Sequence, residues 1–421
     1  MTTARTATPS TARAINDRLA LNLLLDQGPL TATELRDLTG LSRPTVADLL
    51  ERLQRTGLVA VVGERGEQRR GPNARLYALI ADRAHIAAID VREAGVSLVV
   101  ADLAGRTLAT AELPAGAFAS DASDADGAGG AHAGGASDLA ERSVQALLDT
   151  AREAGVGHLH TVAVGAPGLV DPATGRLNST GALTDWHTGL LAALGELPGT
   201  DLILENEVNL AAVAEHRIGA ARDRDTFVLL WLGQGVGAAV VLDGKLRRGA
   251  SGGTGEIGFL PVPGTGSLPS ATGCEGGFHA LVGSAAICAL ARSHGLPAAD
   301  GRALAEIDAR AEGDAPAAEA AVRAAIAAGP SGEAFLDTLA ERIALGAAAV
   351  CVVLDPGCLV LGGEIGRAGG AELADRVERR LATLSPLRAE VRPGAAGGGA
   401  VLSGAVLTAC DAVRRDLFGE P

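Results

Sequence analysis

Four neighbouring residues near the N-terminus, Ser42, Arg43, Pro44 and Thr45, form a candidate DNA-binding site. The side chains of Ser42, Arg43 and Thr45 can hydrogen-bond to DNA. Apolar residues at helical spacing follow them and predict one buried stripe: Val46, Leu49, Leu50 and Leu53. Ser42 is a plausible helix N-cap, and Pro44 is tolerated in a first turn. Because side chains at the start of an exposed helix can reach base edges in the major groove, we expect a DNA-reading helix here.

A second, shorter helix is expected just before the reading helix. Thr31 and Glu34 have capping-box spacing, and Thr39-Gly40 ends the stretch. An apolar helix precedes it and ends near Gln27-Gly28-Pro29. A short capped helix, a glycine turn and an amphipathic helix together predict a helix-turn-helix.

Two short strands are expected after Gly57, at Leu58–Val62 and Ala74–Leu79. The tip between them carries Arg69 and Arg70, which could enter a minor groove or grip phosphate as a wing. A helical protein-interaction module with a solvated basic loop would give the same pattern, so that alternative stays open.

The charge distribution limits where nucleic acid could bind. Residues 1–80 hold 11 Arg against 8 Asp and Glu, a formal charge of +3, whereas the remainder carries −17. Because phosphate would repel that acidic remainder, DNA contact should be confined to the first eighty residues. A hydrophobic content of 47% excludes a disordered protein. With neither an apolar run long enough to span a bilayer nor a signal peptide, we expect a cytoplasmic protein without membrane contact.

The rest of the chain has α/β patterning. Strands are expected at His85–Asp90 and Val96–Asp102, joined by a tight turn, and at Thr161–Val164. The stretch 115–137 is nearly all Ala, Gly, Ser and Asp, and is expected to be a flexible surface loop. A helix is expected at Leu139–Ala154.

Six motifs, in order over residues 82–421, resemble the ROK family of repressors, open reading frames and sugar kinases. They are Asp90 with Asp102-Leu-Ala-Gly105, Gly165-Ala-Pro-Gly168, Glu205-Asn-Glu-Val-Asn-Leu-Ala-Ala212, Gly233-Gln-Gly-Val-Gly237, Gly255-Glu-Ile-Gly258 and Leu354-Asp-Pro with Leu361-Gly-Gly363. Repressors of that family also carry an N-terminal winged helix-turn-helix.

The resemblance implies an α/β fold in which a winged helix-turn-helix, residues 1–81, precedes an actin-like (ribonuclease-H-like), two-lobed sugar-kinase domain, residues 82–421. Lobe 1 is expected over about 82–200 plus a C-terminal helix at about 401–421, and lobe 2 over about 201–400. It further implies a DNA-binding transcription regulator, a repressor that binds a palindromic operator in double-stranded DNA as a homodimer or homotetramer.

Kinase activity is not expected, because the phosphate loops depart from the family pattern. The first family loop reads Asp-x-Gly-Gly-Thr, and here it reads Asp90-Val-Arg-Glu-Ala94. Close approach of backbone to phosphate requires those glycines. In the second loop Gln234 replaces a threonine, and Glu207 stands where the family's catalytic Asp would be. The rival reading is a sugar kinase that uses Glu207 as its base.

No cofactor or metal is expected. The family's zinc site uses one His and three Cys, and here Phe259 takes the His position. Ser270, Thr272 and Gly277 take the cysteine positions, while Cys274 sits at a non-ligand position.

The altered sugar pocket is a candidate site for a sugar or sugar-derivative effector. Carried over from the family, its polar residues are Asn206, Glu207, Glu256 and His279, the last in place of a carboxylate. Phe259 removes one polar contact. A changed set of buried polar groups implies a changed ligand. The alternative is that these residues only hold the lobes together in a DNA-binding dimer that responds to no effector.

Overall fold

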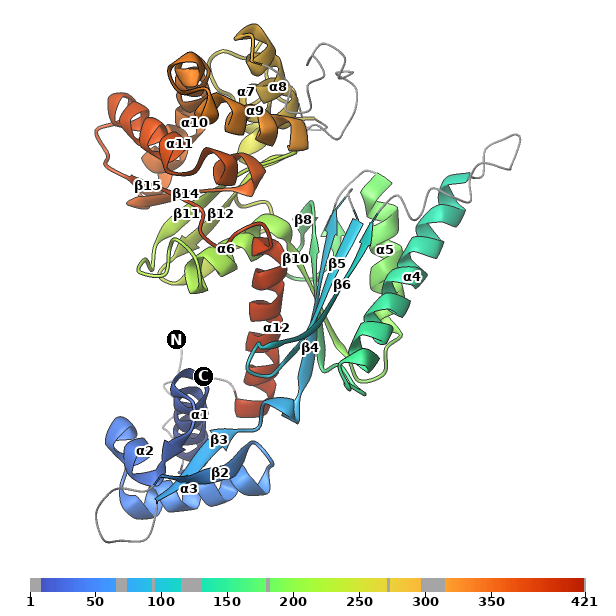
Figure 1. The fold of residues 1–421 in the computed structure, drawn as a ribbon, viewed down its shortest axis with the longest axis vertical. Coiled ribbons are helices and arrows are strands. Elements are labelled where there is room, and N and C mark those ends of the chain that lie inside the picture. The colour runs from blue at the N-terminus through green and yellow to red at the C-terminus, as the bar shows by residue number, and fades with distance from the viewer. Residues whose placement is uncertain are drawn as a thin grey trace.

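The chain folds as a small head followed by two lobes, each built on its own sheet (Figure 1). This computed structural model describes residues 9–65, 74–92, 95–114, 131–178, 182–270, 273–296 and 315–419. Within them, no helix is both long and apolar enough to cross a membrane.

The head contains three helices and a three-stranded sheet. Its helices are α1 (Pro9–Gln27), α2 (Ala32–Thr39) and α3 (Arg43–Arg55). Its strands are β1 (Leu30–Thr31), β2 (Val59–Arg65) and β3 (Ala74–Leu79), in the order β1-β3-β2. The predicted caps are present, since Thr31 and Glu34 form a capping box and the Ser42 side chain accepts from the amide of Thr45. The winged helix-turn-helix architecture is therefore confirmed, with β1 as a strand that the sequence pattern did not reveal.

The first lobe is a five-stranded sheet in the order β10-β7-β4-β5-β6. Its strands are β4 (His85–Arg92), β5 (Gly95–Asp102), β6 (Thr107–Pro114), β7 (Thr161–Ala166) and β10 (Asp201–Asn206). Helices α4 (Ala131–Glu153) and α5 (Ala182–Gly195) cover one face (Figure 1). The opposite face is covered by the C-terminal helix α12 (Ala400–Phe418). A small hairpin of β8 (Leu169–Val170) and β9 (Leu177–Asn178) lies beside β10.

Two sequence-based boundaries differ from the structure. Strand β10 pairs in parallel with β7, so residues 201–206 belong to the first sheet, whereas the expected lobe boundary near residue 200 assigns them to the second lobe. Helix α4 begins at Ala131, so the last seven residues of the predicted loop 115–137 are helical. The part of that loop from 115 to 130 lies outside the described residues.

The second lobe is a mixed sheet in the order β13-β12-β11-β14-β15, reached through helix α6 (Glu207–Arg217). Its strands are β11 (Phe227–Leu232), β12 (Val236–Leu242), β13 (Lys245–Arg247), β14 (Cys358–Gly362) and β15 (Glu390–Pro393). Its helices are α7 (His279–Val282), α8 (Ser284–Ser293), α9 (Ala315–Ala327), α10 (Glu333–Leu354) and α11 (Gly363–Leu384).

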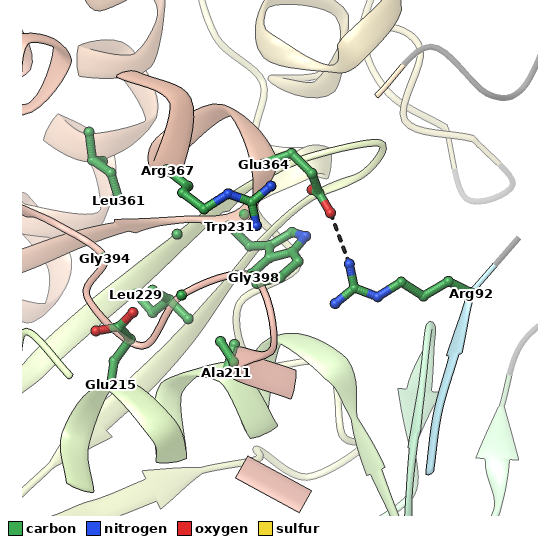
Figure 2. A pocket seen from close by; sticks show the side chains of 14 residues that line it. Arg92, Ala211, Glu215, Leu229, Trp231, Leu361, Glu364, Arg367, Gly394 and Gly398 are labelled. Carbon is green, nitrogen blue, oxygen red and sulfur yellow. Dashed lines mark hydrogen bonds and ion pairs between the residues drawn. The ribbon is translucent and has the colours of Figure 1, made fainter. Parts of the chain in front are cut away.

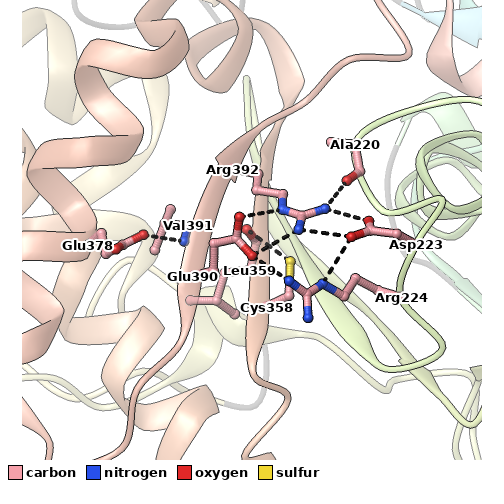
Figure 3. A network of polar contacts seen from close by, with 9 residues as sticks. All are labelled: Ala220, Asp223, Arg224, Cys358, Leu359, Glu378, Glu390, Val391 and Arg392. Carbon is pink, nitrogen blue, oxygen red and sulfur yellow. Dashed lines mark hydrogen bonds and ion pairs between the residues drawn. The ribbon is translucent and has the colours of Figure 1, made fainter.

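A charged network fastens the edge of the second sheet to the loop that follows α6 (Figure 3). The Arg392 guanidinium of β15 donates to both carboxylate oxygens of Asp223, at 2.6 and 3.2 Å, and to Glu390. Arg224 donates to Glu390 at 2.6 Å. The hydrogen bond from Arg392 lowers the pKa of Asp223 to about 2. The network is half-exposed, so it positions this edge more than it stabilises the fold.

One apolar cluster runs from the head to the second sheet without a break. It includes Leu21 of α1, Val413 and Val401 of α12, and Val360 of β14, all at most 1% exposed. Helix α12 also packs tightly on α6, where a Cβ on Gly404 would collide with the carbonyl of Leu210. The three parts of the molecule are therefore joined through α12.

Candidate DNA-binding head and interlobe pocket

The N-terminal end of α3 presents the predicted reading residues to solvent. Ser42, Arg43 and Pro44 are exposed and Thr45 is half-buried. The Ser42 and Thr45 hydroxyls lie 2.7 Å apart, so the two side chains are engaged with each other. Arg43 forms no ion pair with another described residue. Arg43 is therefore the group best placed to reach a base edge, while Ser42 shapes the first turn.

The remainder of the head fixes the direction of α3. The Arg52 guanidinium of α3 donates to the Asp17 carboxylate of α1 at 2.6 Å and also pairs with Asp48. At the base of the wing, Arg65 of β2 pairs with Glu34 of α2. The predicted wing-tip residues Arg69 and Arg70 lie outside the described residues. Their role stays a prediction.

All four predicted ligand residues line one cavity between the lobes. The cavity has a volume of about 240 Å³, and Asn206, Glu207, Glu256 and His279 are among its lining residues. This is more than ten times the roughly 10–15 Å³ that a single water needs on the same measure, so the cavity has room for one sugar ring. The start of α6 lines it from one side of the interlobe boundary, and the segment that leads into the turn Ile257–Phe259 lines it from the second lobe.

Asn206 is already fully hydrogen-bonded within the protein. As the N-cap of α6, its side-chain oxygen accepts from the amides of Val208 and Asn209, at 2.9 and 3.2 Å. Its amide nitrogen donates to the carbonyl of Gly168 at 3.0 Å and to the carboxyl of Glu207 at 2.9 Å. These four bonds use both donors and both acceptor positions. Asn206 therefore positions Glu207 and the first lobe, and has no free position left for a ligand.

Glu207 is the most electrostatically perturbed group in the cavity. Burial, together with the nearby carboxylates of Asp90 and Glu256, raises its pKa to about 8. Burial also raises the pKa of Asp90 and of Glu256, and lowers the pKa of His279. At neutral pH the Glu207 carboxyl is therefore mostly protonated and the His279 imidazole is neutral.

Two residues that the sequence pattern did not single out close the phosphate-loop region. Arg92, at the end of β4, donates to Asp90 at 2.9 Å and reaches across to Glu364 of α11 at 3.0 Å (Figure 2). The Glu364 carboxylate also lies against Gly233 of the second loop. Glu93 and Ala94 of the first loop lie outside the described residues.

The hollow beside this ion pair is small. It is lined by Arg92, Glu364, Gly363 and Arg367 among others, and its free volume is about 20 Å³ (Figure 2). A single water needs about 10–15 Å³ on the same measure. This hollow thus admits about one water, whereas Gly235 and Gly237 of the second loop line the larger interlobe cavity. The signal in the sequence was the charge of Arg92 at a position where the family has glycine.

The segment that would hold zinc does not fit the metal. Phe259 lines the cavity, and Ser270 forms an isolated bridge with Gly273. Thr272 lies outside the described residues. Neither a hydroxyl nor a phenyl ring replaces the thiolates and imidazole that zinc prefers. Over the described part of the chain, no three His, Cys, Asp or Glu side chains gather in a way that would hold a metal ion.

Comparison with known proteins gives matches for both parts of the chain. Residues 137–411 match the ROK family and residues 15–71 match the MarR family. The DNA-binding transcriptional dual regulator NagC of Escherichia coli K12 is 23% identical over 262 residues, which cover 59% of this chain and 58% of that protein. Glucokinase of Thermotoga maritima is 33% identical over 127 residues, covering 30% of this chain and 40% of the kinase.

A solved structure shares the complete architecture. It is a ROK family transcriptional regulator described as a homolog of the Escherichia coli MLC protein. It matches with a TM-score of 0.71 at 19% identity, over 97% of this chain and 98% of that one. At this identity the likeness shows the fold: a winged helix-turn-helix followed by a two-lobed body of the sugar-kinase type.

The head and the lobes thus define a class of proteins in which a MarR-type winged helix precedes a sugar-kinase-like body. The chain belongs to the ROK family, whose match covers more than half of its residues. It spans a little over half the length of the curated regulator it matches, and its relatives include both regulators and sugar kinases.

Proposed function

We propose that this protein is a DNA-binding transcription regulator, a repressor whose affinity for DNA is controlled by a sugar or sugar-derivative effector. The observation that carries the proposal is Arg43, exposed and without an ion-pair partner among the described residues, at the start of a capped helix in a head of MarR type. The names of the NagC regulator and of the MLC homolog support the same reading.

The partner we propose is double-stranded DNA with a roughly palindromic operator. A homodimer or homotetramer would place two heads on half-sites about one helical turn apart, or a multiple of that. Such a regulator would act in the cytoplasm, together with the chromosome.

We also propose that the protein is not an enzyme. Phosphoryl transfer needs backbone amides and a metal-bound nucleotide at the phosphate loops. The Arg92–Glu364 ion pair lies at the first of these loops, where the family has a glycine, and the hollow beside it has a free volume of about 20 Å³. The competing sugar-kinase function predicts ATP consumption that depends on both a sugar and Mg²⁺, with Glu207 as the base. An ATPase assay over a sugar panel that showed such turnover would overturn this part of the proposal.

Selection of bound DNA from a random pool, at modest salt, tests the regulator itself. We expect an enriched, two-fold symmetric motif. Arg43→Ala should relax base preference at one position in each half-site, at a cost of about 1–3 kcal/mol for the preferred base. Arg55→Ala is the matched control, because Arg55 is exposed at the far end of the same helix. Absence of any enriched motif with the intact chain would contradict the proposal.

A further inference from the structure

The interlobe cavity has an unusual balance of charged groups. Two carboxyl groups line it, those of Glu207 and Glu256, and no Lys or Arg is among its described lining residues. His279 adds no positive charge, since burial lowers its pKa. An anionic ligand would therefore leave water for a cavity whose described lining provides neutral polar groups and two carboxyls but no cation. That transfer is unfavourable without a paired cation.

The cation whose charge acts on Glu207 is already paired within the protein. Arg92 is held by Asp90 at 2.9 Å and by Glu364 at 3.0 Å, and it lines the smaller hollow on the other side. The second oxygen of Asp90 is buried and has no hydrogen-bond partner. Near Glu207, the Asp90 oxygen can thus still accept a hydrogen bond, whereas the positive charge of Arg92 is already paired.

Two aromatic rings are a second, independent feature of the cavity that suits a cationic sugar. Trp231 and Phe259 both line the cavity, and Phe259 is 40% exposed. The whole chain has only nine aromatic residues of the Phe, Trp and Tyr types, so two in one cavity is a marked concentration. The faces of aromatic rings attract cations, and they also pack against the apolar faces of sugar rings.

We propose that the cavity binds a small polyhydroxylated ligand with a protonated amine, such as an amino sugar whose amine is free, in preference to neutral and phosphorylated sugars. The ammonium group would lie next to the Phe259 ring and donate to the carboxyl oxygens of Glu256 and of the mostly protonated Glu207, which still accept hydrogen bonds. The hydroxyl groups would face His279 and Thr254, which also line the cavity. This inference rests on the proposed effector function of the same pocket.

Calorimetric titration of the intact protein at pH 7 with four probes tests the inference. The probes are glucosamine, N-acetylglucosamine, glucose and glucosamine 6-phosphate. Acetylation removes the charge of the amine with little change to the ring, so we expect glucosamine to bind at least about tenfold more tightly than N-acetylglucosamine. Equal affinity, or preference for a neutral or phosphorylated probe, would overturn the proposal.

Matched variants assign the selectivity to the cavity. Glu256→Gln should reduce glucosamine affinity about tenfold and leave the weak binding of glucose unchanged. Phe259→Leu keeps the apolar volume, removes the ring face, and should reduce the preference for glucosamine severalfold. Glu275→Gln is the control, because Glu275 is an exposed carboxylate of the neighbouring segment that does not line the cavity. If Glu275→Gln lowered affinity as much as Glu256→Gln, general surface charge would explain the preference and the assigned site would be wrong.

The outcomes separate this inference from the proposed function. Selection of a DNA motif without binding of any probe would leave the regulator standing and refute the amine pocket. Amine-selective binding without any DNA motif would support the pocket and refute the regulator.

Discussion

At the scale of single residues, Glu207 shows how position overrides residue type. The same carboxyl group on an exposed helix would be ionised at neutral pH, but here burial and two neighbouring carboxylates raise its pKa to about 8. The groups that face it are Asp90 and Arg92 from β4, and Glu256 and His279 from the second lobe. A backbone hydrogen bond at Glu207 and the charge of Arg92 oppose the upward shift of the pKa, and the charge of Arg92 is shared with Asp90 and Glu364.

This shift predicts a pH-dependent stability that Glu207→Gln should remove. The pKa of Glu207 is raised in the folded state, so its contribution is fully present below about pH 4.5 and is lost as pH rises to about 8. In thermal melting without ligand, the melting temperature of Glu207→Gln should rise relative to that of the native protein as the pH increases from 5 to 8.5. Glu275→Gln should track the native protein throughout. A constant difference between Glu207→Gln and the native protein would contradict the assignment.

The sequence predicted which residues meet in the cavity but not what each one does there. Asn206, Glu207, Glu256 and His279 come from motifs that the family resemblance aligns, so their convergence could be foreseen. The complete hydrogen bonding of Asn206 could not, because one of its four partners is the carbonyl of Gly168, 38 residues away. The contact of Arg92 with Glu364 spans 272 residues and was equally hidden.

At the scale of elements, local signals define the head. The capping box at α2 consists of three hydrogen bonds. The Glu34 amide donates to the Thr31 hydroxyl at 3.2 Å. In return, Thr31 donates to the Glu34 carboxylate from its amide at 2.8 Å and from its hydroxyl at 2.9 Å. All of these bonds lie within three residues. Sequence patterns find such contacts well, because spacing alone nearly determines them.

Loss of this cap should loosen α2 and, through it, the turn that orients the reading helix. Thr31→Ala is expected to cost about 1 kcal/mol of stability in the head. Hydrogen exchange should then speed up at the amides of the first turn of α2. Thr33→Ala is the matched control, because Thr33 is exposed on the same helix and lacks a capping role. Equal acceleration in both variants would mean that helix propensity, not capping, controls α2.

The elements that sequence patterns misplaced depend on distant partners or ambiguous composition. Strand β10 is assigned to the first sheet only by its parallel pairing with β7, 40 residues earlier. Helix α4 begins in a run of Ala and Gly, in which alanine favours helix and glycine opposes it. Neither outcome follows from the local pattern.

At the scale of the whole molecule, two ion pairs bridge the lobes. Arg92 of β4 meets Glu364 of α11 at 3.0 Å, and Arg248 meets Glu205 of β10 at 2.6 Å. Helix α12 lines the smaller hollow at Ala400 and contacts α1 of the head toward its other end. A change in the angle between the lobes therefore has a continuous packed route to the winged-helix head.

We expect the Arg92–Glu364 ion pair to stabilise the closed arrangement of the two lobes. Glu364→Gln removes the charge with almost no change in shape. A partly exposed ion pair contributes up to about 1 kcal/mol. The population of molecules with the lobes apart should therefore rise by as much as about fivefold. Small-angle scattering should show a larger radius of gyration, and hydrogen exchange should increase at the ends of β4 and β11. Glu372→Gln is the control, since Glu372 pairs with Arg376 within α11 itself.

A double-mutant cycle decides whether the pair, and not the helix terminus, is responsible. Glu364 also lies in the first turn of α11, where a negative charge favours the helix dipole. If the ion pair is the cause, Arg92→Gln should open the lobes about as far as Glu364→Gln, and the double variant should go no further than either one. Additive opening by the two substitutions would show that each acts separately, Arg92 through Asp90 and Glu364 through α11. The angle between the lobes would then be set by the Arg248–Glu205 contact and by α12.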